Sequence, residues 1–356
     1  MVGICGLGGM GKTTIAHAVY NAIADHFDYL CLLDDIKGES EKHSLQQQQA
    51  KMLSKISGQK EVIEDVDEGV KLIKRVLKGK KTLLILDNVD ERKQLEKLAG
   101  TCEWFGCGSR IIITTRDSHL LEIHGVERIY DMEGLNHEEY LELLSWMAFG
   151  NMQVDQSYND VMEQVISYAS GLPLALVLTG SDLYRKDVKN WESRIDGFKI
   201  SPHDKIQQIL RVSYDHLEQL EKEVFLDIAC FYTGNELKYV NKMVACARGF
   251  DPHYHIERLK QKCLITIQQY CIIMHDLVRN MGREIVRQES PKDPGKRSRL
   301  WSSEDIVRVL EGSEVSLTLT GIFYFFLFTS YSIFSHNFSV VLQLMRCIFI
   351  SLSLER

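Results

Sequence analysis

Over its first 134 residues the chain alternates short apolar runs with stretches in which apolar side chains recur every three or four positions. The apolar runs are bounded by charged residues or glycines, which is typical of strands buried on both faces of a parallel sheet. They occupy residues 1–5, 29–33, 82–90, 108–117 and 128–130. Since helical stretches separate them, the pattern predicts an α/β domain whose parallel sheet carries helices on both faces.

Beyond residue 134 the strand pattern stops and helical periodicity takes over. The predicted helices cover residues 138–149, 158–170, 174–184, 206–216, 218–231 and 237–247. Two apolar runs, 264–267 and 271–274, then predict a β-hairpin. We therefore expect three domains: an α/β domain over residues 1–134, an α-helical bundle over 135–200 and a winged-helix-like domain over 201–300.

The residues that follow the first predicted strand fit the P-loop pattern of the P-loop NTPase domains. They read Gly6-Leu7-Gly8-Gly9-Met10-Gly11-Lys12-Thr13-Thr14. Glycines let backbone N–H groups approach phosphate oxygens, and the helix that follows adds the positive end of its dipole. We expect Lys12 to reach the β and γ phosphates and the Thr13 hydroxyl to hold Mg²⁺, while Thr14 lies beside the phosphates without a separate role. The alternative is a glycine-rich turn with a chance lysine.

An acid follows the most apolar of the predicted strands. The run 82–86 is continuous and leads directly into Asp87 and Asn88. Because ligands bind at the carboxyl ends of parallel strands, we expect Asp87 to be a partner of Mg²⁺. Its alternative is a loop acid that caps the next helix.

A second strand end carries a cation. The β-rich run 108–117 closes with Arg116 and Asp117. An arginine at this edge of the sheet can pair with a γ-phosphate and so distinguish ATP from ADP. The alternative is a salt bridge with Asp117 or Glu122 on a solvated loop.

Two further positions are ambiguous from the residues alone. Pro173 suits the first turn of a helix that begins near Leu174, and indicates no more than a joint between two helices. His275 follows the predicted hairpin at the start of a helix, where a histidine can face a phosphate or simply pack. Packing is the simpler of these two interpretations.

Composition narrows the classes of protein. A net charge of −7 gives no broad electrostatic reason to bind nucleic acid. Nine cysteines in no framework spacing and a start without a secretory signal indicate reduced thiols in the cytoplasm or nucleus. The pairs Cys102 with Cys107 and His253 with His255 each lack a second pair at metal-binding distance in the sequence.

The end of the chain differs from the rest. After a linker at 301–314, residues 315–356 are dominated by Phe, Leu, Ile, Ser and Val. Membrane contact through residues 317–354 is one interpretation of this hydrophobic tail, although its first apolar stretch is near the lower limit for a span. The other is sequence without an evolved fold.

The order of these motifs resembles the NB-ARC module of plant intracellular immune receptors. The P-loop, LLILDNVD, GSRIIITTRD, GLPLAL, FLDIACF and MHD motifs occur in that succession over about residues 1–310. FLDIACF and the run GREIV at 282–286 resemble the subclass with an N-terminal TIR domain. Neither a TIR domain nor leucine-rich repeats are recognised in this sequence, so we expect a truncated core.

The resemblance implies a nucleotide-dependent switch in plant defence. ADP would hold an inactive state, and ATP would permit an active, self-associating one. By the same match His275 contacts the ADP phosphate and Pro173 lies near the adenine, which reverses the interpretation of His275 as a packing residue. The partners implied are the nucleotide, copies of the chain and full-length receptors.

One departure bears on hydrolysis. The family's usual second acid is Asn88 here, and an amide cannot take a proton from water, although it can orient one. We therefore expect slow ATP hydrolysis or none. Two rival functions remain open at this point: a freestanding P-loop ATPase, and a decoy or adaptor that binds full-length receptors independently of nucleotide.

Overall fold

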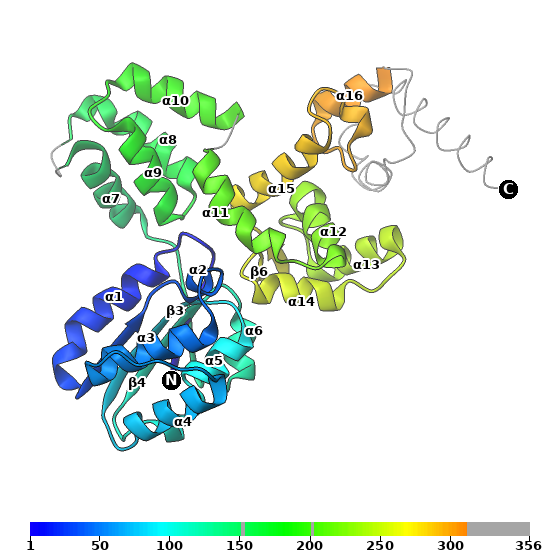
Figure 1. Cartoon of the computed structure of the whole chain (residues 1–356). Coiled ribbons are helices and arrows are strands. Elements are labelled where there is room, and N and C mark those ends of the chain that lie inside the picture. The colour runs from blue at the N-terminus through cyan, green and yellow to red at the C-terminus, as the bar shows by residue number, and fades with distance from the viewer. Residues whose placement is uncertain (151–153, 201–202, 312–356) are drawn as a thin grey trace. The chain divides into compact units, whose positions relative to one another are not determined.

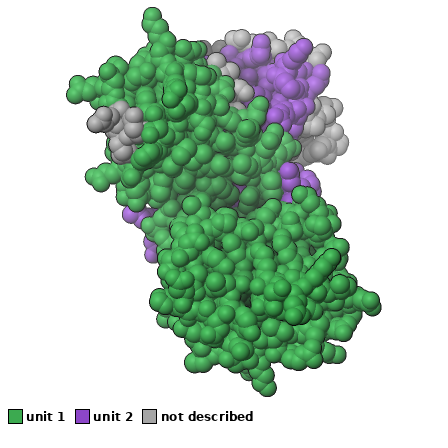
Figure 2. Space-filling model, turned by 60° about the vertical axis from the view of Figure 1, so that its left-hand side comes forward, with its two compact units in different colours: residues 1–213, 261–263 green, residues 214–260, 264–356 purple. Residues whose placement is uncertain are grey.

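The computed structural model describes residues 1–150, 154–200 and 203–311 (Figure 1). The chain forms two compact units, which Figure 2 shows in separate colours. Unit 1 comprises residues 1–213 and 261–263, and unit 2 comprises residues 214–260 and those from 264 onward. The predicted hydrophobic tail and its membrane contact lie outside the described residues. Among the helices that are described, none is both long and apolar enough to cross a membrane.

A five-stranded parallel sheet forms the centre of the first half of unit 1. Its strands are β1 (Val2–Cys5), β2 (Tyr29–Leu33), β3 (Thr82–Val89), β4 (Arg110–Thr115) and β5 (Arg128–Asp131). They lie in the order β2-β3-β4-β1-β5, and each neighbouring pair is parallel, which confirms the predicted sheet. Because β4 lies between β3 and β1, the segments that follow these three strands meet at one edge of the sheet.

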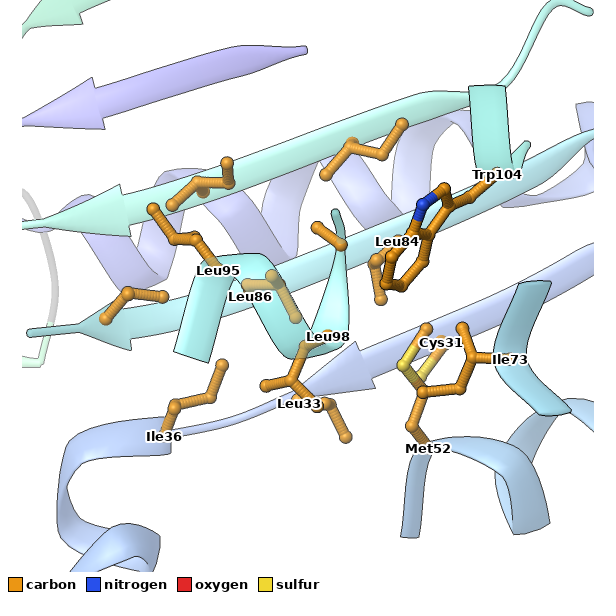
Figure 3. Close-up of a cluster of buried hydrophobic side chains, with 14 of the residues drawn as sticks. Cys31, Leu33, Ile36, Met52, Ile73, Leu84, Leu86, Leu95, Leu98 and Trp104 are labelled. Atoms are coloured by element: carbon orange, nitrogen blue, oxygen red, sulfur yellow. The ribbon is translucent and has the colours of Figure 1, made fainter. Parts of the chain in front are cut away.

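Helices cover both faces of this sheet. They are α1 (Lys12–Ile23), α2 (Ile36–Ser40), α3 (Leu45–Ser57), α4 (Val66–Leu77), α5 (Arg92–Leu98) and α6 (Ser118–Ile123), with short turns η1 (Ala24–His26) and η2 (Cys102–Trp104). Along β3, Leu84 and Leu86 point into a cluster with α3, α4 and α5 (Figure 3), whereas Leu83 and Ile85 pack in a second cluster with α1. All four leucine and isoleucine side chains are fully buried. The continuous apolar run therefore reflects burial on two faces, as predicted.

The remainder of unit 1 is helical. Its helices are α7 (His137–Phe149), α8 (Asn159–Ala169), α9 (Pro173–Leu183), α10 (Val188–Ile200) and α11 (Asp204–Asp215, whose last two residues are counted with unit 2), with the turn η3 (Gln156–Tyr158). Pro173 occupies the first turn of α9, as its fixed φ favours. The α10 helix was not predicted; it is anchored by Trp191, whose fully buried indole donates to the Leu183 carbonyl at 3.1 Å.

Unit 2 combines helices with a short hairpin. It contains α12 (Gln219–Asp227), the π-helical turn η4 (Ile228–Tyr232), α13 (Leu237–Arg248), α14 (His253–Gln261, whose last residue is counted with unit 1), β6 (Thr266–Gln268), β7 (Cys271–Ile273), α15 (Asp276–Glu289), η5 (Pro294–Lys296) and α16 (Ser303–Glu311). The helix predicted over 218–231 is confirmed as a helical segment, but its α-helical part ends at Asp227 and a π-helical turn forms the last part. The hairpin is confirmed but shorter than predicted, with Gln269 and Tyr270 at positive φ in a tight turn.

A buried ion-pair network ties the end of unit 2 to α12. The carboxylate of Asp227 accepts hydrogen bonds from Arg299 Nε at 2.7 Å and from Arg248 Nε at 2.8 Å. Arg299 also donates to Glu223 at 2.7 Å, and its side chain is 1% exposed. Two arginines thus neutralise two acids, and the segment around residue 299 is fastened to α12.

Candidate functional site

The P-loop occupies the turn between β1 and α1, where its glycines meet neighbouring segments at close range. Gly9 and Gly11 have φ of 88° and 89°, a conformation that residues with a Cβ rarely adopt. A Cβ on Gly9 would lie 2.8 Å from Leu174 Cβ, and one on Gly8 would lie 2.7 Å from Arg116 Nη1. Position 9 therefore requires glycine both for its backbone and for the approach of α9, and Gly8 leaves room for the end of the Arg116 side chain.

Lys12 begins α1 and turns back over the loop. Its ammonium donates to the carbonyl of Gly6 at 2.7 Å and to that of Leu7 at 2.9 Å, and the residue is 8% exposed. Burial, and next the charge of Arg116, lower the pKa of Lys12 to about 8. Lys12 forms no ion pair with a carboxylate in the part of the chain that the structure describes, and such a buried cation is suited to an incoming anion.

Asp87 lies near the end of β3, held by two hydroxyl groups. Thr13 Oγ1 donates to its carboxylate at 2.9 Å, and Thr114 Oγ1 donates to Oδ1 at 2.6 Å. Asp87 is 3% exposed, and among the described residues no Lys or Arg forms an ion pair with it. Mg²⁺ prefers oxygen ligands, and a hydroxyl next to a carboxylate that pairs with no cation provides them. Thr13 and Asp87 therefore fit the predicted metal.

Asn88 interrupts β3 and contacts a residue that the motifs did not indicate. It has a φ of 56° at an irregularity in the pairing with β4, and its backbone N–H donates to Thr114 Oγ1 at 2.8 Å. Its side-chain amide donates to Asp35 Oδ1 at 2.7 Å. Asp35 also has positive φ, at 46°. The sequence did contain a signal for Asp35. As at the end of β3, polar residues directly follow the apolar run of β2, and here they are Asp34 and Asp35.

Arg116 directly follows β4 and lies against the P-loop. Its Nη1 donates to the carbonyl of Ile209 at 3.0 Å. Burial lowers the pKa of the guanidinium, and the charge of Asp35 acts in the opposite direction. The predicted alternative partner Asp117 instead caps α6, where it accepts from the His119 N–H at 3.1 Å.

Pro173 lies at the P-loop because a backbone hydrogen bond holds the next residue there. The N–H of Leu174, the next residue, donates to the Gly9 carbonyl at 3.1 Å. The first turn of α9 therefore rests directly on the P-loop. From the residues alone the Gly-Leu-Pro-Leu stretch indicated only a helical joint, because no local pattern reveals a contact between segments more than 160 positions apart.

These segments enclose a cavity of about 580 Å³, within the range of small-ligand sites. It is lined by Gly9, Gly11, Lys12, Thr13, Thr14, Asp87, Asn88, Arg116 and Pro173 among the predicted residues, and by His17, Asp34, Asp35 and Thr114 in addition. Gly6 contacts the cavity indirectly through Lys12, and Gly8 through Arg116. The cavity thus joins a cation for phosphate, a donor set for Mg²⁺ and a second cation at the end of β4.

His275 belongs to unit 2. It caps the N-terminus of α15, and its Nδ1 accepts from the Leu277 N–H at 3.1 Å. Its predicted contact with a nucleotide phosphate stays a prediction.

Comparisons with known proteins agree with this geometry. Residues 1–154 match the family model of the NB-ARC domain, and residues 218–290 match that of the disease resistance protein Roq1-like, winged-helix domain. The chain is 41% identical to the disease resistance protein RUN1 of Vitis rotundifolia over 313 residues, which are 87% of this chain and 23% of RUN1. It is 37% identical to the TMV resistance protein N of Nicotiana glutinosa over 331 residues, 90% of this chain and 28% of N.

The chain therefore spans about a quarter of the length of these two relatives. Among solved structures, it is similar to the Walker-type ATPase PABY2304 of Pyrococcus abyssi, at 15% identity and a TM-score of 0.49, over 79% of this chain and 90% of the other. That likeness is too loose to bear on function. The two family models and the identities to the resistance proteins carry the assignment: residues 1–154 form an NB-ARC domain and residues 218–290 a Roq1-like winged-helix domain, in a chain that is homologous to part of TIR-type plant disease resistance proteins.

Proposed function

We propose that the chain is an ADP/ATP-dependent molecular switch of plant immune signalling, inactive with ADP and active with ATP. The observation that carries this proposal is the convergence of Lys12, the Thr13–Asp87 pair and Arg116 on one cavity. The P-loop backbone and Lys12 bind phosphates, and Arg116 pairs with a γ-phosphate when one is present. Mg²⁺, held by Thr13 and Asp87, would neutralise phosphate charge. Pro173 bounds the cavity on the side where we propose that the adenine lies.

The proposal extends to the arrangement of the chain. We propose that the α/β domain ends near residue 134, the helical bundle near 200 and the winged-helix-like domain near 300. His275 would contact the ADP phosphate from the last of these, so that the inactive state depends on all three domains. We propose the cytoplasm or nucleus as its location, and full-length receptors or other copies of the chain as partners.

The first experiment asks what the protein carries. We would purify the chain without added nucleotide, denature it and identify the released compound by ion-exchange chromatography. Near-stoichiometric ADP is expected, and Lys12→Ala should abolish it, since that substitution removes an interaction worth about 4 kcal/mol before desolvation at an effective dielectric near 20. A folded parent protein that releases no nucleotide and binds partners equally with or without Lys12 would favour the nucleotide-independent adaptor.

A second experiment concerns His275. The variant His275→Ala is expected to release ADP faster than the parent, measured with a fluorescent ADP analogue and an excess of unlabelled ADP. Arg279→Ala, on the same helix, is the matched control and should leave the rate unchanged. Equal dissociation rates in the His275 variant and the parent would remove His275 from the switch.

Hydrolysis is proposed to be slow because an amide stands at position 88. The single substitution Asn88→Asp would bring two carboxylates together, since Asn88 already donates to Asp35, and one of them would hold a proton. The exchange Asn88→Asp with Asp35→Asn preserves the hydrogen bond and moves the acid onto β3. If the missing base limits the rate, this double variant should hydrolyse ATP about 10²- to 10⁴-fold faster than the parent. A parent rate well above about 1 per second would instead favour the freestanding ATPase.

A further inference from the structure

Unit 1 contains a second and larger cavity that the nucleotide switch does not use. It encloses about 940 Å³ between α4, α5, the turn η2 and the end of α6. None of its lining residues lines the nucleotide cavity. Figure 1 shows α4 and α5 next to each other over the sheet. A ligand here would therefore contact unit 1 without touching the P-loop.

Cations dominate the wall that α4 provides. Lys71, Lys74 and Arg75 are spaced at i, i+3 and i+4, which places them on one face of the helix, and Lys78 follows as the C-cap residue of α4. Arg92 of α5 lines the cavity as well. Five basic side chains thus face only two acidic ones, Glu96 and Glu103, in a chain whose net charge is −7. The positive charge is local to this cavity.

Little of this charge is neutralised within the described residues. Arg92 pairs with Glu96 at 2.7 Å, and the Lys74 ammonium lies 4.9 Å from the centre of the Trp104 ring. Lys71, Arg75 and Lys78 form no ion pair with any described acid. His124 adds no charge near neutral pH, because burial lowers its pKa.

A solvated helix face would explain part of this pattern. Cations in the last turn are favoured by the helix dipole, which accounts for Lys74 and Arg75. It does not account for Lys71, or for the like-charge spacing of Lys71 to Arg75, which destabilises a helix. An external anion that binds all of them would relieve the repulsion.

The floor of the cavity is rigid. Trp104 is 7% exposed and belongs to the hydrophobic cluster that α4 and α5 form with the sheet (Figure 3). Ile123, at 42% exposed, adds apolar surface at the edge. The cations therefore project from helices fixed by a common core, which reduces the entropy lost on binding.

We infer that this cavity is a second ligand site, and that it binds a compact polyphosphate. Its volume suits a small molecule, and cations converge on it from two helices rather than along an extended track. Arg75 can bind a phosphate through two N–H groups, and the lysines serve as point charges around it.

The test uses myo-inositol hexakisphosphate, titrated by calorimetry into the full chain saturated with ADP and Mg²⁺ at 150 mM salt. Saturation keeps the probe out of the nucleotide cavity. We expect one equivalent to bind, with a Kd that rises as ionic strength rises. The double variant Lys71→Ala with Arg75→Ala should raise the Kd at least about tenfold, because two charge-assisted contacts are lost.

Two controls make the outcome decisive. The variant Lys42→Ala with Lys60→Ala removes two exposed lysines outside the cavity and should leave the Kd unchanged. The Lys71/Arg75 variant should also melt at the same temperature as the parent or higher without ligand, since a repulsion is removed. No binding of the probe, an equal loss in both variants, or tighter binding of a hexaglutamate peptide with the same dependence on Lys71 and Arg75 would overturn the inference.

Discussion

Two buried aspartates in the described residues follow a leucine at the end of an apolar run, and their partners differ. Asp87 follows Leu86 on β3, and Asp227 follows Leu226 on α12. Their exposures are close, at 3% and 5%. Among the described residues, the side chains that hold Asp87 are the hydroxyls of Thr13 and Thr114, whereas Asp227 is held by two arginines.

The difference lies in where the neutralising charge comes from. A buried carboxylate is expensive unless a cation or metal accompanies it. Asp227 obtains its cations from the chain, so its role is to hold unit 2 together. Asp87 has hydroxyl partners and lines a cavity, so under the proposed function a cation from solution would neutralise its charge. The partners of a buried acid, more than its burial, therefore separate a structural acid from a ligand-binding one.

The largest expected effect comes from breaking the network of unit 2. Arg299→Ala removes one of the two cations that neutralise Asp227 and Glu223. The remaining negative charge inside the protein should lower the free energy of unfolding by about 3–5 kcal/mol. Denaturant titration of the parent and the variant measures it. The control is Arg287→Ala, which removes an exposed pair with Glu284 and should cost less than about 1 kcal/mol. Equal effects of the two substitutions would mean that the network contributes no special stability.

Removing the charge of Asp87 should affect nucleotide binding with Mg²⁺ more than the stability of the fold. Asp87→Asn keeps the size of the side chain, so the free energy of unfolding should change little, while the gain in nucleotide affinity that Mg²⁺ provides should fall about tenfold to a hundredfold. Nucleotide binding measured with Mg²⁺ and with EDTA separates this gain from the rest. Asp227→Asn is the control: it should destabilise the protein and leave the effect of Mg²⁺ unchanged. If Asp87→Asn instead unfolds the protein as Asp227→Asn does, the two acids do not differ as proposed.

These contrasts show what the sequence could reveal. The run 82–86 predicted β3 and placed Asp87, because strand burial and the position of an acid are both local patterns. The order of the strands then brought Arg116 to the same edge. Asp35 was missed, since its significance depends on a hydrogen bond to Asn88, on a strand that is adjacent in space and distant in sequence.

Unit 2 shows the same limit. Phe-Leu-Asp predicted a helix, and nothing local to it indicated that Asp227 meets Arg299, 72 residues further along. The π-helical turn after Asp227 was missed for a related reason, because periodicity does not distinguish an α-turn from a π-turn over five residues. Pairings across the fold, and not the elements themselves, were the part that sequence reasoning could not supply.

The next effect in size concerns the pH dependence of nucleotide binding. Lys12 has a pKa of about 8 without ligand, and a bound phosphate favours its charged form, so binding takes up a proton above pH 8. Affinity should therefore fall as pH rises above 8, by at most about tenfold per pH unit. The free energy of unfolding of the ligand-free chain should rise between pH 8 and 10.5, because the unfolded lysine binds more protons there.

Binding measured at pH 7, 8 and 9 tests this expectation. Lys12→Arg supplies the control, since a guanidinium stays charged over this range and any remaining affinity should not vary with pH through this residue. An equal pH dependence in the parent and in Lys12→Arg would assign the titration to another group.

The smallest expected effect concerns Asp34, an acid at the nucleotide cavity that is neither buried nor paired with a permanent cation. Its Oδ1 lies 2.7 Å from His17 Nε2, and the two side chains are 51% and 42% exposed. Because solvent already stabilises such a carboxylate, Asp34→Asn should change the free energy of unfolding by less than about 1 kcal/mol in denaturant titration. It should also leave the effect of Mg²⁺ on nucleotide affinity intact, unlike Asp87→Asn. If Asp34→Asn weakened the effect of Mg²⁺ on nucleotide affinity as strongly as Asp87→Asn does, Asp34 at the end of β2 would also bind the metal. Burial with hydroxyl partners would then no longer distinguish the acid that binds Mg²⁺.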